Sequence, residues 1–337
     1  MPFNARELFK MILVYGFVPF FVLIIGISIY FILQFIKGKC KFSLPNIFKL
    51  FFSFVSISSL LLIIWGVFFE RFQVTLNEYS LSSSSISKNV KIAVISDTHL
   101  GKFKDEKYMQ KVVDKINTVK SLDFVLIPGD WTLEPEIKDL EKLFSPLKNI
   151  RVPIYGVLGN HDLQQPGPRV KDELESALKV NNVILVDKSF VELETITIAG
   201  VGDRWAKEDD SQFLVKTNDS KPLLVLAHNP DSTREYPDFL NPTKEILTVT
   251  GHTHCGQVRI PYLYKMALPV ENGYFDKGFY SMYGDFKVAR QVDVSIIIEG
   301  VSLNKMLFIT CGVGEVGLPI RLFNPPAVDV IEIKKEI

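Results

Sequence analysis

The sequence is poor in cysteine and histidine, and it has no excess of charge of either sign. Its 337 residues include three cysteines and five histidines, and 38 basic residues balance 38 acidic ones. Because proteins that bind nucleic acid usually carry a basic excess, we expect no nucleic-acid partner. Cys40, Cys255 and Cys311 lie far apart and do not resemble a disulfide framework, which favours a reducing compartment slightly over an oxidising one.

Charge is also missing from two long apolar segments, residues 11–36 and residues 50–69. At about 1.5 Å per helical residue, each is long enough to cross a hydrocarbon core of about 30 Å. The first is too long for a signal peptide, and no small-residue cleavage site follows it. We therefore expect residues 1–70 to form a two-helix transmembrane hairpin, with a pair of buried core helices as the alternative. The linker between the two segments is rich in lysine: Lys37, Lys39, Lys41 and Lys49.

The basic residues near these segments do not decide which face of the membrane carries the rest of the chain. The linker lysines favour a cytoplasmic linker, because basic residues concentrate on that side. The opposing flanks carry nearly as many basic residues: Arg6, Lys10, Arg71, Lys88 and Lys91. Both orientations therefore remain open.

Residues 71–337 alternate strand-like and helix-like patterns, which predicts a layered α/β domain. A strand pattern within residues 71–81 is followed by a serine-rich connection over residues 82–89. Further strands are expected over residues 91–96, 124–128, 152–157, 183–186, 195–201, 223–227 and 246–250. Helices are expected over residues 105–119, 134–147 and 169–179.

Polar residues suited to chemistry follow the expected strands at the point where each strand ends. They form five short motifs: Asp97-Thr98-His99, Gly129-Asp130, Gly159-Asn160-His161-Asp162, His228 and Gly251-His252-Thr253-His254. A single histidine after a strand is usually an ordinary core or surface residue. All five histidines of this chain fall in these motifs, however, and α/β folds build their sites at the carboxyl ends of strands.

The residue types in these motifs suit a site for divalent first-row metals, which bind oxygen and imidazole ligands. The chain lacks the closely spaced cysteines of a structural zinc site. Two metal ions about 3.5–4 Å apart need a carboxylate between them, and Asp130 is the natural candidate. Glycines before Asp130, Asn160 and His252 would allow the sharp turns that bring these side chains together.

The order of the five motifs resembles the calcineurin-like metallophosphoesterase superfamily. The resemblance implies a two-sheet β-sandwich flanked by helices, with two divalent metal ions, Mn²⁺ first and Fe²⁺, Zn²⁺ or Co²⁺ as alternatives. It assigns one metal to Asp97, His99, Asp130 and His254. It assigns the other to Asp130, Asn160, His228 and His252. His161 would act on the phosphoryl group or the leaving oxygen, oriented by Asp162.

A narrower resemblance rests on the segments GHTHCGQVRIP and GVGEVGLPIRLFNPP, which begin at Gly251 and Gly312. They are similar to a membrane-associated branch that includes UDP-2,3-diacylglucosamine pyrophosphatases of the chlamydial type. This implies a catalytic domain over residues 71–337 on the cytoplasmic side of a bacterial inner membrane. It would split UDP-2,3-diacylglucosamine into UMP and 2,3-diacylglucosamine 1-phosphate, in lipid A biosynthesis. Two departures are Cys255, where the branch has glycine, and a long stretch over residues 276–305.

Two other functions remain open. The first is a phosphodiesterase or phosphatase that acts on cell-envelope material at the outer face, and the second is a pseudoenzyme that binds metal only. The expected partners are a phosphorylated, lipid-linked substrate and the lipid bilayer. Arg204 and Arg321 follow apolar runs near the motif loops, and they are candidates to bind the substrate phosphate, with solvated or structural roles as the alternative.

Overall fold

The chain divides into two compact units, with the boundary between Gly66 and Val67. The computed structural model describes residues 18–163, 166, 169–236, 243–271, 273, 275–283, 288–292 and 301–336. The division falls four residues before the expected start of the catalytic domain, residue 71. Glu70 and Arg71 are both buried, and Glu70 accepts a hydrogen bond from the backbone of Asn324, so the end of the apolar segment is part of the second unit.

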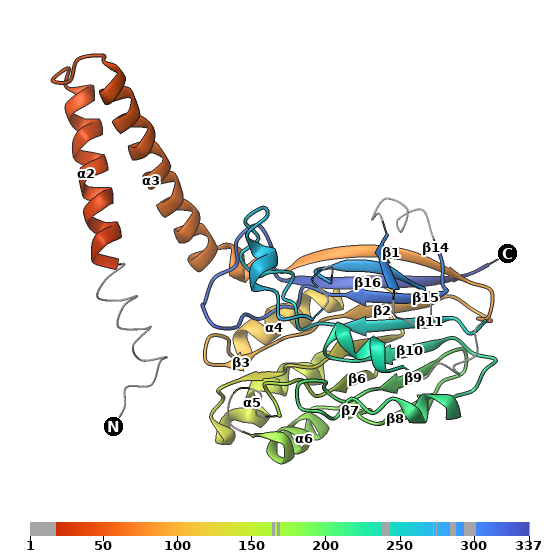
Figure 1. The fold of residues 1–337 in the computed structure, drawn as a ribbon. Coiled ribbons are helices and arrows are strands. Elements are labelled where there is room, and N and C mark those ends of the chain that lie inside the picture. Colours follow the sequence, from red (N-terminus) through yellow and green to blue (C-terminus); the bar gives the residue numbers. More distant parts are fainter. Residues whose placement is uncertain are drawn as a thin grey trace. The chain divides into compact units, whose positions relative to one another are not determined.

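The first unit contains two helices that lie side by side, α2 (Val18–Ile36) and α3 (Leu44–Phe68) (Figure 1). Among the described residues, one helix is long and apolar enough to cross a membrane: Leu44–Phe72 has a mean hydropathy of 2.3 and is 6% buried. The described part of α2 offers a shorter apolar stretch, Leu23–Ile36. Residues 11–17 of the first expected span lie outside the described residues, so the two-span hairpin stays a prediction.

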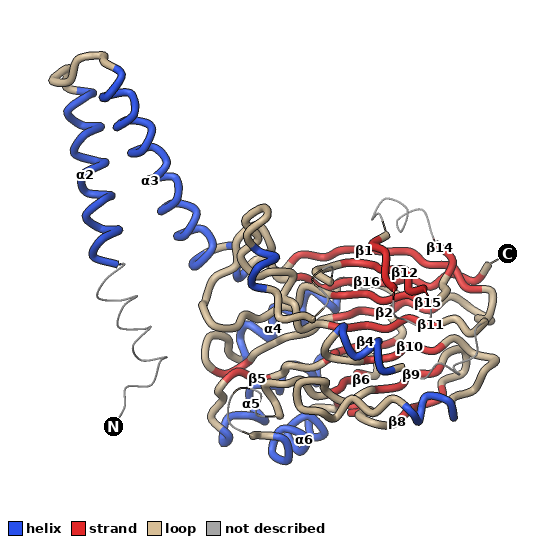
Figure 2. The backbone as a smooth tube through the Cα atoms, viewed as in Figure 1, coloured by secondary structure: helices blue, strands red, loops and turns tan. Residues whose placement is uncertain are grey.

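The second unit is built on two large sheets, whose strands are drawn in red in Figure 2. In the described part of the chain, the first sheet has the order β14 (Val301–Ser302), β1 (Thr75–Ser83), β16 (Ala327–Lys335), β2 (Val90–Val94), β4 (Phe124–Pro128), β6 (Ile154–Val157), β7 (Val183–Leu185). The second has the order β13 (Val288–Gln291), β12 (Gly278–Tyr283), β15 (Lys305–Ile309), β11 (Ile246–Thr250), β10 (Leu223–Leu226), β9 (Thr197–Gly200), β8 (Ser189–Glu192). A short pair, β3 (Leu100–Gly101) and β5 (Thr132–Leu133), lies apart.

Apolar side chains from both sheets form one core between the layers. Ile92 and Leu126 of the first sheet belong to the same buried cluster as Leu224, Leu247 and Phe308 of the second. The centre of each sheet is parallel, with β2, β4 and β6 in one and β9, β10, β11 and β15 in the other. Because parallel strands share a carboxyl edge, the residues that follow them are brought together there.

Three helices pack against the first sheet: α4 (Glu106–Asn117), α5 (Leu140–Phe144) and α6 (Lys171–Val180). Helix α4 begins after Asp105, whose carboxylate accepts a hydrogen bond from the Tyr108 amide at 3.0 Å, a standard N-cap. The second sheet carries the 3-10 turns η5 (Gln212–Lys216) and η6 (Pro230–Glu235). The expected two-sheet sandwich flanked by helices is therefore confirmed.

Two regions differ from the sequence-based expectations. The helix expected over residues 134–147 is broken into η3 (Ile137–Asp139), α5 and η4 (Ser145–Asn149), and Pro146, which lacks an amide hydrogen, lies in the last of these turns. The long stretch over residues 276–305, whose role the sequence left open, supplies edge strand β13 and its neighbour β12 to the second sheet and edge strand β14 to the first. Within that stretch, residues 284–287 and 293–300 lie outside the described residues.

A buried ion cluster joins the start of the second unit to a loop near its end. The Glu315 carboxylate pairs with the Arg71 guanidinium and lies 3.4 Å from the Lys104 ammonium, which also donates to the Arg71 carbonyl at 2.6 Å. The Glu315 and Lys104 side chains are both 0% exposed. Burial lowers the pKa of Lys104 to about 7, although the Glu315 carboxylate opposes that shift. Glu315 is thus the anion that compensates two buried cations.

Replacing Glu315 by glutamine should destabilise the protein, because Arg71 and Lys104 would stay buried without an anionic partner. Breaking a buried pair in this way costs about 3–5 kcal/mol in the free energy of unfolding. Urea denaturation of the purified full-length protein in detergent measures this difference. The matched control is Glu194→Gln, since Glu194 pairs with Lys88 at the surface and its loss should leave the stability unchanged. Equal stability of the two variants would contradict the assignment.

Candidate metal centre

The side chains of the five motifs meet at the shared carboxyl edge of the parallel strands. Asp97 and His99 follow β2, Asp130 follows β4, Asn160 follows β6, His228 follows β10, and His252 and His254 follow β11. Each of these seven residues is 5% exposed or less. The strands thus place a set of buried imidazoles, carboxylates and one amide in a single site.

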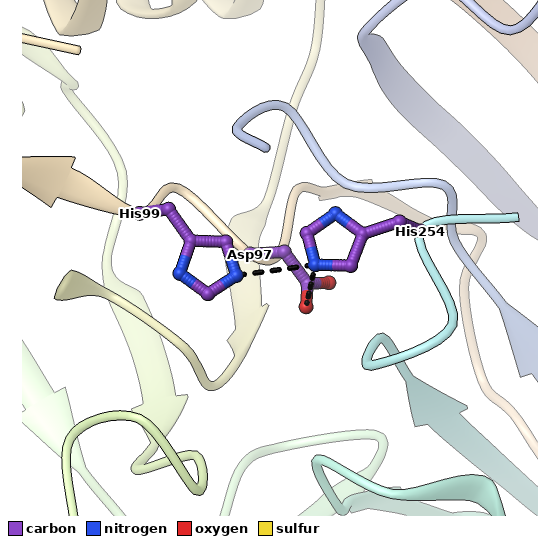
Figure 3. A group of neighbouring side chains, drawn as sticks. All are labelled: Asp97, His99 and His254. Carbon is purple, nitrogen blue, oxygen red and sulfur yellow. Dashed lines mark hydrogen bonds and ion pairs between the residues drawn. The ribbon is translucent and has the colours of Figure 1, made fainter. Parts of the chain in front are cut away.

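The first cluster consists of Asp97, His99 and His254 (Figure 3). The Nε2 atoms of the two histidines are 3.1 Å apart, and their rings are stacked with centroids at 5.0 Å. His254 Nε2 lies 3.5 Å from the Asp97 carboxylate. Asp130 also approaches this cluster, with its Oδ2 atom 3.5 Å from His99 Nε2. These are the four residues predicted to hold the first metal.

The second cluster consists of Asp130, His228 and His252. His228 Nε2 lies 3.2 Å from Asp130 Oδ2, 3.1 Å from His252 Nδ1 and 3.0 Å from Asn160 Oδ1. Asp130 Oδ2 is therefore close to a histidine of each cluster. This is the position that a carboxylate between two metal ions requires.

Two of the histidines are oriented by backbone carbonyls. His99 Nδ1 donates to the Thr132 carbonyl at 3.2 Å, and His228 Nδ1 donates to the Pro128 carbonyl at 2.8 Å. These bonds place a proton on Nδ1, so Nε2 is the atom of each ring that faces the cluster, as in metal-binding histidines. In His99 the Nε2 lone pair then faces the Asp130 carboxylate, whereas in the metal-free site His228 Nε2 carries a proton that it shares with Asp130 Oδ2 and Asn160 Oδ1. Divalent cations fit this arrangement, because each would be held by oxygen and imidazole ligands.

Burial and charge set the protonation of these ligands. Burial lowers the pKa of His99 to about 4 and that of His252 to about 3, so both rings are neutral near pH 7 and can bind metal. Burial also disfavours the charged form of His228, but the Asp130 carboxylate outweighs it and raises the pKa of His228 to about 10. Burial raises the pKa of Asp130, but His228 and His99 together hold it well below its usual range. A metal that binds His228 must therefore displace a proton.

The backbone at the site adopts conformations that L-amino acids rarely use. Five of the predicted ligands have a positive φ: Asp97 (50°), His99 (45°), Asp130 (52°), His252 (67°) and His254 (47°). Such strain is characteristic of functional sites. Two glycines allow the chain segments to approach, because a Cβ atom at Gly159 would collide with Asp130 and one at Gly251 would collide with Asp97.

Asp162 holds the loops of the site together. Its carboxylate accepts hydrogen bonds from the amides of Gly159 (3.0 Å), Trp131 (3.1 Å) and Thr132 (3.0 Å), and from the Thr132 hydroxyl (2.8 Å). Burial raises the pKa of Asp162 to about 7, and these donors oppose that shift. The bonds give Asp162 a positioning role for the Asp130 and Asn160 loops, which its expected role as the partner of His161 did not include.

His161 lies beside the two clusters and is more exposed than the ligands. Its ring is perpendicular to that of His99, with centroids 5.0 Å apart, and its backbone amide donates to Asp130 Oδ1 at 2.9 Å. His99, Asp130 and His161 have side-chain ligand atoms within 4.8 Å of one another. His161 is thus close enough to act on a phosphoryl group bound at the site, and this role stays a prediction.

A cavity of about 480 Å³ adjoins the second cluster and includes Arg204, Trp205, Lys207 and Glu271 in its lining. Arg204 pairs with Glu271 at 3.1 Å and with Asp209 at 3.2 Å. The Trp205 ring stands edge-on to the His252 ring, with centroids 4.6 Å apart. Sequence reasoning missed Trp205, although it follows the candidate Arg204 directly, because an exposed tryptophan gives no signal of a neighbouring ligand.

Arg321 is placed differently from the expectation. It is 0% exposed, and its guanidinium donates to the carbonyls of Gly314 (2.6 and 2.9 Å), Cys311 (2.9 Å) and Asn324 (3.2 Å). A buried guanidinium bonded to three backbone carbonyls stabilises a loop and is not available to a substrate phosphate. Of the two arginine candidates, only Arg204 lies at a cavity beside the metal ligands.

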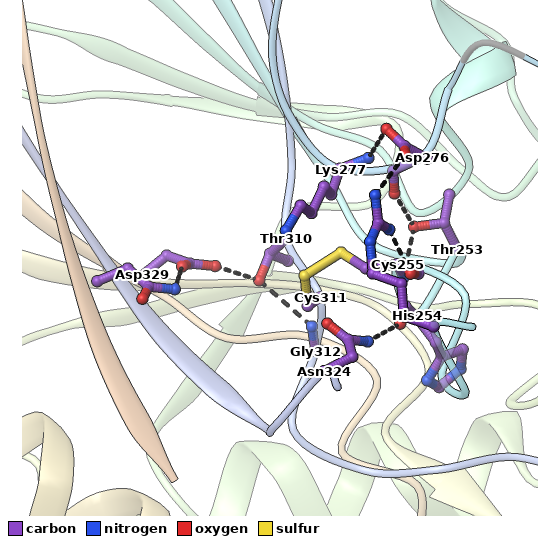
Figure 4. The surroundings of a disulfide bond; sticks show 12 residues. Thr253, His254, Cys255, Asp276, Lys277, Thr310, Cys311, Gly312, Asn324 and Asp329 are labelled. Atoms are coloured by element: carbon purple, nitrogen blue, oxygen red, sulfur yellow. Dashed lines mark hydrogen bonds and ion pairs between the residues drawn. A yellow bond between two sulfur atoms is a disulfide. The ribbon is translucent and has the colours of Figure 1, made fainter. Parts of the chain in front are cut away.

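Cys255 and Cys311 form a disulfide (Figure 4). The cysteine spacing predicted no disulfide, and this expectation is wrong for Cys255 and Cys311. The two are 56 residues apart in the sequence, but β11 and β15 are neighbouring strands, and the loops that follow them meet. Disulfide pairing depends on such proximity in the fold, which cysteine spacing does not reveal.

The disulfide is part of the support of ligand His254. Asn324 Nδ2 donates to the His254 carbonyl at 2.7 Å, and Arg259 donates to the Cys255 carbonyl at 2.7 Å. On the other side of the disulfide, the Cys311 carbonyl accepts from Arg321. The backbone that carries His254 is thus fixed by a covalent bond and by two hydrogen bonds.

Comparison with known proteins identifies the family. Residues 90–256 match the model of the calcineurin-like phosphoesterases. The chain belongs to this family. It is a metal-dependent phosphoester hydrolase, and the residues present fit the dinuclear divalent centre that the family uses. The resemblance stated from the five motifs is confirmed.

Three relatives show how far the similarity extends. An uncharacterised metallophosphoesterase of Helicobacter pylori (strain ATCC 700392 / 26695) is 25% identical over 333 residues, which cover 94% of this chain and 80% of the relative. Phosphodiesterase YaeI of Escherichia coli (strain K12) is 27% identical over 189 residues, 54% of this chain and 67% of the relative. UDP-2,3-diacylglucosamine pyrophosphatase LpxG of Chlamydia trachomatis serovar D is 24% identical over 221 residues, 51% and 66% respectively.

Two substitutions should separate metal binding from proton transfer in this member of the family. Asp130→Ala should lose both metal ions and essentially all turnover, because both clusters share this carboxylate. His161→Ala should keep its metal and lose rate by about 10²–10⁴-fold, the usual contribution of a general acid or base. Metal content by mass spectrometry, together with turnover of an aryl phosphodiester, distinguishes the two effects. A His161→Ala protein without bound metal would refute the role given to His161.

Proposed function

We propose that this protein is a membrane-anchored phosphodiesterase or phosphatase that acts on cell-envelope material at the extracytoplasmic face. The observation that carries the proposal is the Cys255–Cys311 disulfide beside metal ligand His254. Disulfides persist in oxidising compartments and are rare in the cytoplasm. With two membrane spans, a catalytic domain outside the cytoplasm leaves the lysine-rich linker inside, which agrees with the preference of basic residues for that side.

The helix Leu44–Phe72 supports the membrane anchor, because it is long and apolar and almost wholly unburied. The catalytic unit begins within this helix, at Val67. The enzyme would therefore act on phosphoesters at or near the bilayer surface. Mn²⁺ is the metal that we propose first, since carboxylate, amide and imidazole ligands suit it and no thiolate is present among the predicted ligands.

The chain's own residues would divide the catalytic work as follows. Asp97, His99 and His254 on one side of Asp130, and Asn160, His228 and His252 on the other, would hold divalent ions, whose chemistry would be to activate a water and to neutralise charge on the phosphoryl oxygens. Asp130 would contribute its carboxylate to both clusters. Asp162 fixes the loops that carry Asp130 and Asn160. His161 donates a proton to the leaving oxygen from beside His99 and Asp130. The cavity at Trp205 would receive the part of the substrate that lies next to the phosphate.

Hydrolysis of UDP-2,3-diacylglucosamine to UMP and 2,3-diacylglucosamine 1-phosphate is the second candidate. Its support is the similarity to LpxG, at 24% identity over 51% of this chain. A nucleotide-activated lipid precursor is made in the cytoplasm, however, so this function needs a cytoplasmic catalytic domain. The disulfide favours the opposite face. A metal-binding pseudoenzyme is disfavoured because the ligand set is complete.

The redox state and the accessibility of the cysteines test on which side of the membrane the catalytic domain lies. When thiols are blocked in living cells and the protein is then denatured and reduced, Cys255 and Cys311 should become newly reactive, because the disulfide protected them. In intact spheroplasts, a membrane-impermeant maleimide should not label Cys40, and detergent should expose it. A Cys40→Ser variant controls for the identity of the labelled thiol. Reduced Cys255 and Cys311 in cells, with Cys40 labelled from outside, would exclude the extracytoplasmic assignment.

Hydrolysis rates measured with the purified protein distinguish the two proposed substrate classes. With Mn²⁺, it should hydrolyse an aryl phosphodiester faster than UDP-2,3-diacylglucosamine presented in mixed micelles. Asp130→Ala serves as the metal-dependence control, since it removes the shared ligand. Turnover of the UDP-linked lipid well above that of the diester would make the pyrophosphatase the better assignment.

A further inference from the structure

We propose that the catalytic domain carries a second membrane contact, an exposed apolar surface beside the metal centre that docks on the lipid bilayer. This inference rests on the proposed function and deepens it, because it makes the substrate a phosphoester carried by a lipid. The surface, called here the apolar rim, is formed by two loops. Its six large apolar side chains are Ile260 (41% exposed), Tyr262 (91%), Leu263 (60%), Met266 (85%), Leu318 (53%) and Phe323 (55%).

Backbone pairing holds the two loops next to each other. Arg259 donates from its amide to the Leu322 carbonyl at 2.8 Å, and Leu322 donates to the Gln257 carbonyl at 3.1 Å. The Gln257 side chain also donates to the Leu318 carbonyl at 2.9 Å. The first loop closes with the 3-10 turn η7 (Tyr264–Ala267). Contiguous exposed apolar surface of this kind marks sites where proteins bind partners or membranes.

The rim is held in place by the same contacts that support the metal ligand. Arg259 bonds to the Cys255 carbonyl at 2.7 Å and to the Tyr264 hydroxyl at 2.9 Å, and Cys255 is fixed by its disulfide to Cys311. Tyr262 and Phe323 have φ values of 67° and 57°, a costly conformation for an aromatic residue. Strained backbone that presents exposed aromatic side chains is expected where the loop serves a function.

The end of the apolar helix indicates that the occupant is lipid. Phe69 and Phe72, at the end of the candidate span Leu44–Phe72, are 53% and 38% exposed and belong to the catalytic unit. Between them, Glu70 accepts a hydrogen bond from the Asn324 amide at 2.6 Å, directly next to Phe323 of the rim. The rim therefore adjoins Phe69–Phe72, the residues that join the candidate span to the catalytic unit, and with the span in a membrane it would lie near the membrane interface.

The composition of the rim also suits a bilayer surface. Aromatic side chains such as Tyr262 and Phe323 favour the interfacial region, and aliphatic side chains such as Leu263 and Met266 gain free energy when they enter the acyl region. Lys265 is exposed in the same turn and would attract anionic headgroups. This mixture of apolar, aromatic and basic side chains is typical of proteins that lie on a membrane.

Docking of the rim would hold the metal centre at a fixed place above the bilayer. Asn324 donates to the His254 carbonyl at 2.7 Å, so the residue next to Phe323 contacts the backbone of a metal ligand. A phosphoester on a lipid headgroup would then meet the site without leaving the membrane. The substrate class that this predicts is a lipid-linked phosphoester, and a free polar phosphoester would gain nothing from the rim.

A fluorescent probe on the rim tests the contact without reference to activity. Full-length protein with Cys40→Ser and Met266→Cys is labelled with an environment-sensitive dye and placed in phosphatidylethanolamine–phosphatidylglycerol vesicles. The emission should shift to shorter wavelength and should be quenched by nitroxides on the lipid acyl chains. The control carries Ile184→Cys instead, 44% exposed on β7 at the far edge of the first sheet, and should show neither effect. Equal emission and quenching at the two positions would overturn the proposal.

Turnover in the same vesicles tests the consequence for substrate. Leu263→Ser with Met266→Ser should lower hydrolysis of a lipid-linked phosphodiester by about tenfold or more, because two apolar side chains that would enter the bilayer on docking are lost. Hydrolysis of a water-soluble aryl phosphodiester should be unchanged. The matched control, Val180→Ser with Ile184→Ser, should change neither rate. An equal loss on both substrates would overturn the proposal that the apolar rim docks on the bilayer. Wild-type protein that is inactive on every phosphodiester would instead overturn the proposed function, and the fluorescence result would still stand.

Discussion

The fold depends on one constraint: electron-rich side chains must be brought together in a buried site where their lone pairs face one another. Asp130 lies at the centre of this arrangement, within 3.5 Å of His99 Nε2 and 3.2 Å of His228 Nε2. Carboxylates and neutral imidazoles in such proximity are stable only when cations or protons lie between them. Three features bring these side chains together. The parallel strands end at the same edge, five of the predicted ligands adopt positive φ values, and Gly159 and Gly251 allow the chain segments to approach.

Contacts around His254 connect this centre to the rest of the molecule. The residue that follows it is bonded through a disulfide to Cys311, and its carbonyl is bonded to Asn324. Asn324 in turn donates to Glu70, at the end of the apolar helix. A single network therefore joins the first residues of the catalytic unit, the exposed apolar loops and the predicted metal ligand His254. The disulfide in this network is also the observation on which the proposed extracytoplasmic location rests.

Local sequence signals predicted the sheets, and the residues predicted as metal ligands lie close together. Strands β4 and β11 have the predicted bounds, because each is a short apolar run that stops at a glycine before a ligand motif. The seven predicted ligands meet in one site, since parallel strands share a carboxyl edge. Local patterns failed where the outcome depends on distant partners. The Cys255–Cys311 pairing follows from the neighbouring positions of β11 and β15. Arg321 has the sequence context of a phosphate ligand, but three carbonyls from other turns enclose it.

The central claim is that Asp130 joins two metal sites, and magnetic coupling measures this directly. Full-length protein reconstituted with Mn²⁺ should bind two ions per chain. Its electron paramagnetic resonance spectrum should show exchange coupling, because ions that share a carboxylate lie about 3.5–4 Å apart. One ion per chain, or two ions with the spectrum of isolated Mn²⁺, would contradict the account.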